Sequence, residues 1–414
     1  MAITNNPIAL DSTAQAILTE MDRENALLSA YVEGQRRAVY SDISAFANVV
    51  RGNSVAQNRK LFPEGDQIIV PWKDMDDANH NTDETAYQVP MNIVHHGLVE
   101  LQSGVQVPGV FLQWHHCTPY GVQFSHQQAF LKCVDGLAAG QYYITFGYTW
   151  GSQGAVSGSS WNFTLTQAVP AGGLLSGFET MADSASSAWR VKSWASNAAT
   201  DPIETVTVAS GAEGTNLGTM NQILRSDDDL NGMQNVGYGH NRWDTSAVRK
   251  YLNGSGNGWW TPSEEFDIRP DQYAKKGFLS GFSADFLAEI KPVKVVTALN
   301  TVEGYADASV NTFDKFFLPS LEQMFINPQL SGVEGESWKY WQRRLGRATK
   351  AAQYSTYPNL ITTGIDNKAS AQLVRLPSAH RGSSCYTWFV SSSGYVSYYS
   401  AYGAIRFSPV CVIC

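Results

Sequence analysis

The fold is decided near the end of the sequence, by the stretch Thr387-Trp-Phe-Val-Ser-Ser-Ser-Gly-Tyr-Val-Ser-Tyr-Tyr399. Two runs of aromatic and apolar residues flank the central Ser-Ser-Ser-Gly, a pattern that predicts a β-hairpin. Successive side chains of a strand point to opposite faces, so Tyr395, Ser397 and Tyr399 should project together. Tyr398 departs from this alternation, and we expect a bulge or loop there if it too is exposed.

The composition around this hairpin is typical of a recognition surface. Ser and Tyr fill 13 of the 35 positions from His380 to Cys414, and this segment has no Asp, Glu, Asn, Gln or Lys. Tyr offers a large, rigid contact area at low entropic cost, and Ser adds adaptable hydrogen bonding. Calcium is held mostly by carboxylate and amide oxygens, so we expect a binding surface that works without calcium.

The composition of the whole chain narrows the class of protein. A chain of 414 residues is long for one core, so we expect two or three domains. Aromatic residues reach 12% while charged residues stay at 16%, which favours a β-rich protein. The net charge of −8 argues against nucleic-acid binding, and the basic run 343–350 predicts a solvated helix face or connector. The sequence also lacks an apolar run long enough for membrane insertion.

Residues 1–64 form the first predicted region, a helical attachment or oligomerisation segment. Ser12-Thr-Ala-Gln15 is a plausible capping box, and apolar residues recur at helical spacing up to about Gly34. The apolar face of this helix packs either on neighbouring copies of the chain or on its own β domain.

Residues 65–215 form the second predicted region, an antiparallel β-sandwich. Short β runs alternate with Gly and Pro signals, beginning with the strand 65–71. The clearest later runs are 142–146, 161–165 and 204–208.

Residues 216–414 form the third predicted region, an α+β domain in which helices precede terminal strands. The pattern predicts capped helices over 244–252 and 283–290 and a strand over 293–297. The apolar stretch 407–413 should close the sheet, with Pro409 at an edge or bulge.

Three blocks of this third region carry a family resemblance: 238–253, 312–322 and 388–410. In their order and spacing they resemble the C-type-lectin-fold domain of variable proteins from phage diversity-generating retroelements. The resemblance implies a C-terminal C-type-lectin-like domain, related in fold to formylglycine-generating enzymes. The whole chain would then be an α+β and all-β multidomain protein, with an N-terminal helix, an antiparallel β-sandwich and the lectin-like domain.

In that family, error-prone reverse transcription rewrites codons near the carboxyl terminus, and the rewritten residues form an exposed ligand-binding surface. The resemblance places the variable region at about 380–405. The positions that would vary are His380, Ser383, Ser384, Cys385, Tyr386, Thr387, Phe389, Ser391, Tyr395, Ser397, Tyr398, Tyr399, Ser400, Tyr402, Gly403 and Ile405. The positions that would form the fixed scaffold are Trp388, Val390, Gly394, Val396, Ala401, Ala404 and Arg406.

Catalytic and metal-binding patterns are weak. Five cysteines fit neither a disulfide framework nor a zinc spacing, so we expect reduced thiols. His115-His116-Cys117 with His126 is the best metal-like cluster, but adjacent strand residues point to opposite faces, so the two histidines cannot chelate together without a bend. The acidic run 227–229 is most simply a surface turn. We therefore expect no enzyme, no metal and no cofactor.

These observations lead to a functional hypothesis. We expect a phage virion protein, on the tail or particle surface and made in the bacterial cytoplasm, that binds a host cell-surface protein or glycan during adsorption. By analogy with tail fibres, we also expect a homotrimer. We expect the N-terminal segment to attach it to other virion proteins. Two alternatives stay open: a bacterial surface ligand-binding protein, which needs an export signal that the amino terminus does not supply, and a structural capsid or tail decoration protein.

Overall fold

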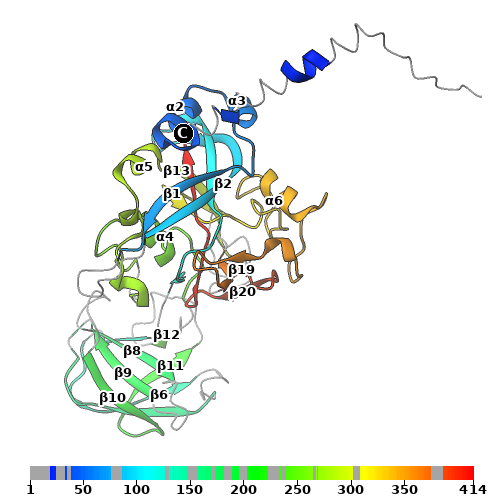
Figure 1. Cartoon of the computed structure of the whole chain (residues 1–414). Helices are drawn as coiled ribbons and strands as arrows, with labels where there is room; N and C mark the ends of the chain where they lie inside the picture. Colours follow the sequence, from blue (N-terminus) through cyan, green and yellow to red (C-terminus); the bar gives the residue numbers. More distant parts are fainter. Residues whose placement is uncertain are drawn as a thin grey trace, which may run out of the picture.

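The computed structural model describes most of the chain beyond residue 38. The described residues are 19–24, 33–34, 39–75, 86–125, 130–133, 135–146, 157–169, 171, 173–180, 189–194, 203–221, 233–234, 239–263, 267, 269–301, 308–373 and 386–414. They form few helices and many strands, arranged as a main body around a five-stranded sheet and a separate β-barrel (Figure 1). The predicted mixed, β-rich fold class is confirmed at this level.

The five-stranded antiparallel sheet organises the main body. Side chains along its first strand alternate between exposed and buried, as expected when one face packs on a core. Its last strand in sequence is buried at every position, as expected when both faces of a strand are covered, and it lies between two other strands. In spatial order the strands are β1 (Gln67–Lys73), β2 (Ala86–Glu100), β3 (Gln106–Trp114), β22 (Val410–Ile413) and β15 (Phe316–Phe317).

The pairing of β3 with β22 changes the predicted domain boundaries. Val110 pairs with Ile413 and Gln113 with Val410, so residues from the first and the last third of the chain share one sheet. The sheets therefore do not separate 65–215 from 216–414 as predicted. The predicted closing strand exists, but Pro409 is at neither an edge nor a bulge: it precedes β22, and its carbonyl accepts a hydrogen bond of 3.0 Å from the N–H of Trp114.

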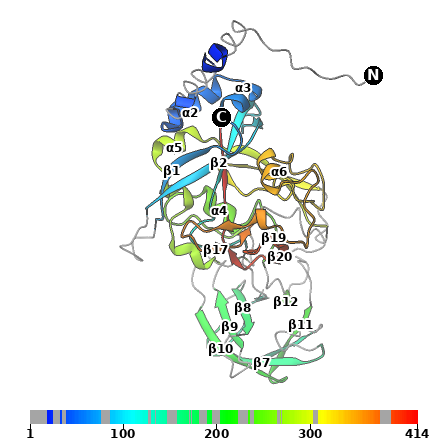
Figure 2. The ribbon, with the colours of Figure 1, turned by 45° about the vertical axis from the view of Figure 1, so that its right-hand side comes forward.

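Two short helices that we did not predict pack on this sheet. They are α2 (Ile43–Arg51), capped by the side chain of Asp42, and α3 (Val55–Leu61), capped by Ser54. Phe46 of α2 is fully buried, and both helices contact the sheet strands (Figure 2). The end of the predicted attachment segment 1–64 therefore belongs to the main body.

The predicted amino-terminal helix, from about Ser12 to Gly34, lies largely outside the described residues. Residues 19–24 and 33–34 are helical, and Met21 is 53% exposed. The packing of this helix on neighbouring copies stays a prediction.

The helices and the strand predicted between residues 244 and 297 are confirmed. The first helix runs from Ala247 to Asn253 rather than from Asp244 to Leu252, because Ser246 is its N-cap and Ser246 Oγ accepts the capping hydrogen bond. Another helix carries Arg343 and Arg344 in its last turn, in agreement with the predicted basic helix face. These elements are α4 (Ala247–Asn253), α5 (Ala284–Glu289), β13 (Val293–Ala298), β14 (Ser309–Asp314), which pairs with β13, and α6 (Lys339–Leu345).

The described strands between residues 130 and 234 form a closed barrel, and the predicted antiparallel sandwich was wrong. The predicted strands exist, but eight strands close on themselves and leave no open pair of sheets. One strand, β11, pairs in parallel with both β6 and β12. The barrel strands are β5 (Phe130–Cys133), β6 (Gly140–Phe146), β7 (Ser160–Leu165), β8 (Gly173–Thr180), β9 (Trp189–Trp194), β10 (Ile203–Ser210), β11 (Thr215–Asn221) and β12 (Met233–Gln234).

The barrel is an insertion in the main body. The chain leaves the main body after Ser125 and returns at Gly239, and these two residues adjoin: a Cβ on Gly239 would lie 2.0 Å from the backbone oxygen of Ser125. Gly239 also has a φ of +76°, so both its contact and its backbone require glycine. The barrel lies at the end of the molecule opposite α2 and α3 (Figures 1 and 2).

Short elements complete the main body. They are β4 (Val122–Gln123), paired with β21 (Ala404–Ile405); β16 (Thr362–Thr363), paired with β17 (Ala369–Ser370); β18 (Gln372–Leu373), β19 (Tyr386–Val390) and β20 (Val396–Ser400), which form one sheet; and the 3₁₀ helices η2 (Asp271–Ala274), η3 (Phe278–Gly281) and η4 (Pro358–Leu360).

Candidate ligand-binding surface

The predicted hairpin is confirmed as strands β19 and β20. Their register runs from Tyr386 opposite Ser400 to Val390 opposite Val396. The turn is closed by hydrogen bonds from the N–H of Ser391 to the carbonyl of Tyr395 and from the N–H of Gly394 to the carbonyl of Ser391. The short strand β18 pairs with the other edge of β19.

One set of hairpin residues is buried in the main body. Trp388 and Val396 are fully buried and Val390 is 1% exposed. Ala401, which follows β20, is also fully buried, and its carbonyl accepts a hydrogen bond from the N–H of Ser125. These are four of the positions to which the sequence assigned a scaffold role.

Two further predicted scaffold residues have specific structural reasons. Gly394 has a φ of +81°, and a Cβ there would lie 2.3 Å from the backbone oxygen of Tyr357. Arg406 forms a two-pronged ion pair with Asp366, with N–O distances of 2.7 and 3.1 Å. Hydrogen bonding from Arg406 is the main cause that lowers the pKa of Asp366 to about 2.

The other set of residues forms an exposed aromatic surface, which we call the tyrosine surface. Its predicted members Tyr395, Tyr398, Tyr399 and Tyr402 are between 36% and 46% exposed. The rings of Tyr399 and Tyr402 lie 6.5 Å apart, and Phe389 meets Tyr399 edge to face at 6.1 Å. Exposed aromatic rings gathered in this way are characteristic of interaction sites.

Tyr398 is exposed without the bulge that we predicted. The register of β19 and β20 is continuous, and Tyr398 lies directly opposite Trp388. It therefore shares the face of Trp388, whose ring it meets edge to face at 6.0 Å, and it also contacts the ring of Tyr386 at 4.9 Å. Trp388 is buried beneath it, so tyrosines on both faces of the hairpin reach the surface.

Sequence reasoning missed one member of the tyrosine surface, Tyr354. This residue is 49% exposed, and its ring packs on Trp388 at 5.1 Å and on Tyr398 at 6.1 Å. It belongs to a segment that runs along the free edge of β20, where its N–H donates to the carbonyl of Val396. Its φ of 54° is unusual for a residue with a side chain, and no local pattern indicated it.

Several predicted surface positions are less exposed. Thr387 was predicted to face the ligand, but it is 1% exposed and its hydroxyl donates to the carbonyl of Tyr399. His380, Ser383, Ser384 and Cys385 lie outside the described residues. The half-buried positions are Tyr386, Phe389, Ser391, Ser397, Ser400, Gly403 and Ile405.

The three sequence blocks that carry the family resemblance meet in the core. Asp314 accepts hydrogen bonds from Trp243 Nε1 at 2.9 Å and Arg249 Nε at 2.7 Å, which joins the first block to the second. Asn241 Nδ2 donates to the carbonyl of Tyr386 at 3.0 Å, which joins the first block to the hairpin. These residues hold the tyrosine surface in place and do not contribute to it.

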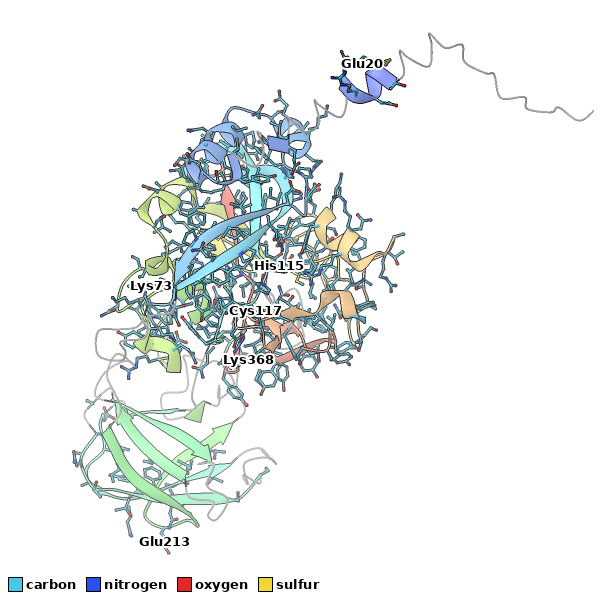
Figure 3. The ribbon with its side chains drawn as sticks, in the orientation of Figure 1. Glu20, Lys73, His115, Cys117, Glu213 and Lys368 are labelled. Carbon is cyan, nitrogen blue, oxygen red and sulfur yellow. The ribbon has the colours of Figure 1, made fainter. Side chains whose placement is uncertain are left out.

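The histidine cluster that the sequence offers as its best metal-like pattern is described only in part. The rings of His115 and His116 lie 4.6 Å apart, because β3 ends at Trp114 and the chain makes there the bend without which the two side chains could not lie together. His115 lies in the main body (Figure 3). His126 and residues 227–229 lie outside the described residues. In the part of the chain that is described, no group of His, Cys, Asp or Glu is arranged to hold a metal ion.

The described cysteine side chains are buried free thiols, in agreement with the expected reduced state. They are Cys117, Cys411 and Cys414. Burial raises the pKa of Cys117 to about 12, and it raises the pKa of Cys411 as well. Such thiols stay protonated and are poor nucleophiles.

The fold and the site define a β-rich protein with a barrel insertion and an exposed aromatic hairpin. Residues 219–413 match the domain of unknown function DUF6273. The matched part contains the hairpin and β22 but not β1 to β3, which complete the central sheet. No curated protein and no solved structure gives a significant match.

Within the described residues, no helix combines the length and apolarity needed to cross a membrane.

Proposed function

We propose that this chain is a phage virion protein that binds a protein or glycan on the bacterial host through its tyrosine surface. The observation that carries the proposal is the division of one hairpin into two sets of residues. Trp388, Val390 and Val396 are buried, whereas Tyr395 and Tyr399 project into solvent. A surface of this kind can change its contacts without changing its core.

The chemistry of the surface favours recognition over catalysis or structural packing. Tyr side chains combine large contact area with a hydroxyl that donates and accepts hydrogen bonds, and they lose little entropy on binding. The proposal that this surface is diversified rests on the resemblance to lectin-fold variable proteins. Several copies on one particle, as in a homotrimeric fibre, would raise a modest affinity through avidity.

The direct test is binding of the purified, fluorescently labelled chain to cells of the proposed host. Simultaneous replacement Tyr395→Ala, Tyr399→Ala and Tyr402→Ala removes three of the exposed rings of the hairpin region. We expect at least about a hundredfold loss of binding, because aromatic residues at the centre of an interface contribute about 2 kcal/mol or more each. Thermal unfolding should stay close to that of the wild type, since these rings are exposed.

A matched control removes exposed apolar side chains from another part of the main body. Leu61→Ala, Ile69→Ala and Val105→Ala change residues that are 41%, 50% and 54% exposed, away from the hairpin. This variant should bind host cells like the wild type. Equal binding by the tyrosine variant and the wild type would contradict the proposal and favour a structural decoration protein.

Diversification has its own test in the neighbouring DNA. A reverse-transcriptase gene and a near-copy of the last coding stretch, differing only at adenines, would support it. Absence of both would remove the diversification claim and leave a lectin-like binding protein.

A further inference from the structure

The charge of the chain is divided unevenly along its sequence. Residues 337–414, which include α6 and the hairpin, contain nine of the 29 lysines and arginines but only one of the 37 aspartates and glutamates, Asp366. This segment has a formal net charge of +8, whereas the rest of the chain, with 20 basic and 36 acidic side chains, has −16. The tyrosine surface therefore belongs to the basic part of an acidic chain.

One exposed cation lies beside the turn of the hairpin. Tyr357 is joined to this turn, because its N–H donates to the carbonyl of Gly394 at 2.9 Å. The guanidinium carbon of Arg347 lies 5.2 Å from the centre of the Tyr357 ring. Arg347 is exposed, and none of the described carboxylates forms an ion pair with it. Its charge is therefore available to a ligand that covers the turn.

Two further cations lie beside the segment that follows β20, where they share the carboxylate of Asp366. Arg406, which follows β21, makes the close contacts at 2.7 and 3.1 Å. Lys368 Nζ lies 3.7 Å from Asp366 Oδ2, and its side chain is 77% exposed. Figure 3 shows Lys368 at the same end of the main body as the hairpin. Two positive charges face one negative charge, so this place also carries a net positive charge.

Two further carboxylates on segments that adjoin the hairpin have cationic partners. Glu322 pairs with Lys350, and Asp244 pairs with Arg242. Each pair is neutral as a whole, so neither offsets the positive charge beside the hairpin.

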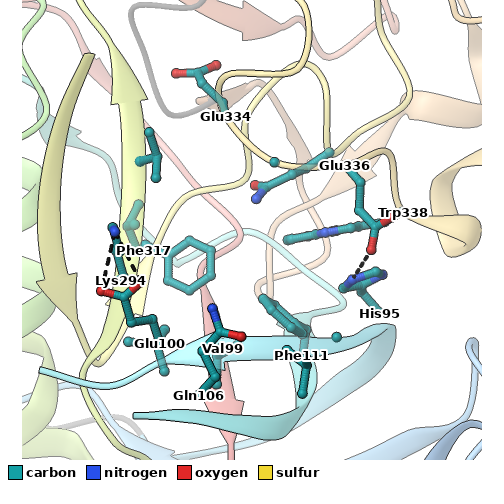
Figure 4. Close-up of a pocket in the computed structure, with 17 residues that line it drawn as sticks. His95, Val99, Glu100, Gln106, Phe111, Lys294, Phe317, Glu334, Glu336 and Trp338 are labelled. Carbon is teal, nitrogen blue, oxygen red and sulfur yellow. Dashed lines mark hydrogen bonds and ion pairs between the residues drawn. The ribbon is translucent and has the colours of Figure 1, made fainter. Parts of the chain in front are cut away.

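The cavity beside β2, β3 and β13 provides a contrast, because charged groups there are held by their neighbours (Figure 4). Lys294 Nζ lies 3.1 and 3.3 Å from the two carboxylate oxygens of Glu100. Glu336 Oε1 lies 3.1 Å from Nε2 of His95. We therefore look for a charged ligand at the tyrosine surface, where exposed cations outnumber the carboxylates that contact them.

We propose that the tyrosine surface binds an acidic glycan of the host, whose carboxylate or phosphate groups meet Arg347 and Lys368. This inference rests on the proposed function and names the ligand class of the same surface. Tyr combines an apolar ring with a hydroxyl, which suits the apolar faces and hydroxyl groups of sugars. The exposed cations steer an anionic ligand to these rings.

A polymer with repeated negative groups fits this arrangement better than a folded protein does. Arg347 and Lys368 lie on different segments beside the hairpin, so one ligand must place a negative group at each of them. A regularly charged glycan does so in many registers, whereas a protein needs one fixed arrangement of acidic side chains.

The first test measures binding of the full chain to cells of the proposed host at low and high salt. Arg347→Gln combined with Lys368→Gln removes both exposed cations, and this double variant should bind about fivefold to tenfold more weakly than the wild type in about 0.05 M salt. In about 1 M salt the Debye length falls to about 3 Å, so the two proteins should bind alike. Equal binding at low salt would overturn the proposal.

Matched variants separate the effect of these charges from other effects. Lys60→Gln combined with Lys339→Gln removes two exposed cations from α3 and α6 and should bind like the wild type. Arg347→Lys keeps the positive charge and should bind within about twofold of the wild type. A loss in either as large as that of the double variant would overturn the assignment to Arg347 and Lys368.

The triple tyrosine variant separates this inference from the proposed function. If it binds weakly while the Arg347 and Lys368 double variant binds like the wild type, the proposed function stands and the acidic ligand is excluded. If the triple tyrosine variant binds like the wild type, the proposed function fails as well.

Chemical treatment of the cells tests the ligand class. Periodate cleaves the vicinal diols of sugars and should abolish binding, whereas proteinase K should leave binding intact. Carbodiimide with methylamine neutralises carboxylates and spares phosphates, so loss of binding after this treatment assigns the negative groups to carboxylates and retention assigns them to phosphates. Binding that survives periodate but is lost after proteinase K would show a protein ligand and overturn the proposal.

Discussion

At the scale of single residues, the hairpin depends on positions where only one residue type fits. Gly394 combines a left-handed backbone with a close approach to the backbone of Tyr357. Any side chain there must displace the segment that carries Tyr354 along β20, because the contact at 2.3 Å is with a main-chain oxygen. The shape of the tyrosine surface therefore rests on a residue that is not part of it.

We predict that Gly394→Ala lowers the free energy of unfolding by about 3 kcal/mol or more, from backbone strain plus the contact with Tyr357. Gly332→Ala is the matched control, since Gly332 has a φ of +77° but no atom within 4 Å of an added Cβ. The free energy of unfolding of Gly332→Ala should fall by only about 1 kcal/mol, because only the strain of the backbone acts there. Denaturant unfolding measures both values, and an equal cost at the two positions would refute the role of the contact.

Residue-level prediction from the sequence succeeded where a local pattern existed. Alternation and the Ser-Ser-Ser-Gly turn predicted the hairpin, which the structure contains. Trp388 and Val396, two predicted scaffold positions, are fully buried in it. They could not show that Thr387 is covered or that Tyr354 joins the surface, because both depend on segments that are distant in sequence.

At the scale of elements, β2 contains an irregularity that places a histidine in the interior. Its register with β3 shifts between Ile93 and His95, as in a β-bulge, and His95 is 6% exposed. Desolvation is the main cause that lowers the pKa of His95 to about 4, and the charge of Arg59 adds to it. The other titratable groups near His95 are His96, Glu64, Lys339 and Glu336.

This arrangement predicts a loss of stability in mild acid. A histidine of the unfolded chain takes up its proton near pH 6.5, whereas folded His95 does so only near pH 4, so the free energy of unfolding falls between these values. His95→Gln should remove up to about 3 kcal/mol of this fall. Chemical denaturation at pH 7 and pH 4.5 measures the difference. His116→Gln, at a half-buried position, should have a smaller effect, and a His95 variant with the wild-type pH profile would exclude this origin.

At the scale of the whole molecule, the central sheet joins distant parts of the chain around an inserted barrel. Period-two alternation identified individual strands such as β1 and β6, but it carries no information on which strands pair. The pairing of β3 with β22 and the closure of the barrel both escaped prediction for this reason. The helices α2 and α3, of nine and seven residues, also escaped prediction as individual elements.

The insertion makes a prediction about folding independence. Removal of residues 126–238 with a direct Ser125–Gly239 connection should leave a folded main body, because the two ends already adjoin. Near-ultraviolet circular dichroism and a cooperative thermal transition would show the retained packing of Trp243 and Trp388, which are both fully buried. A variant without a cooperative transition would mean that the barrel is required for the main body to fold.

The central claim is that folding and recognition use separate residues of one hairpin. Saturation mutagenesis of residues 386–406, with each variant scored for folded display and for binding to host cells, tests it most directly. We predict that changes at Tyr395, Tyr399 and Tyr402 alter binding while display persists, and that changes at Trp388 and Val396 abolish display. Tyrosine positions that fail in display, or that leave binding untouched, would contradict the account.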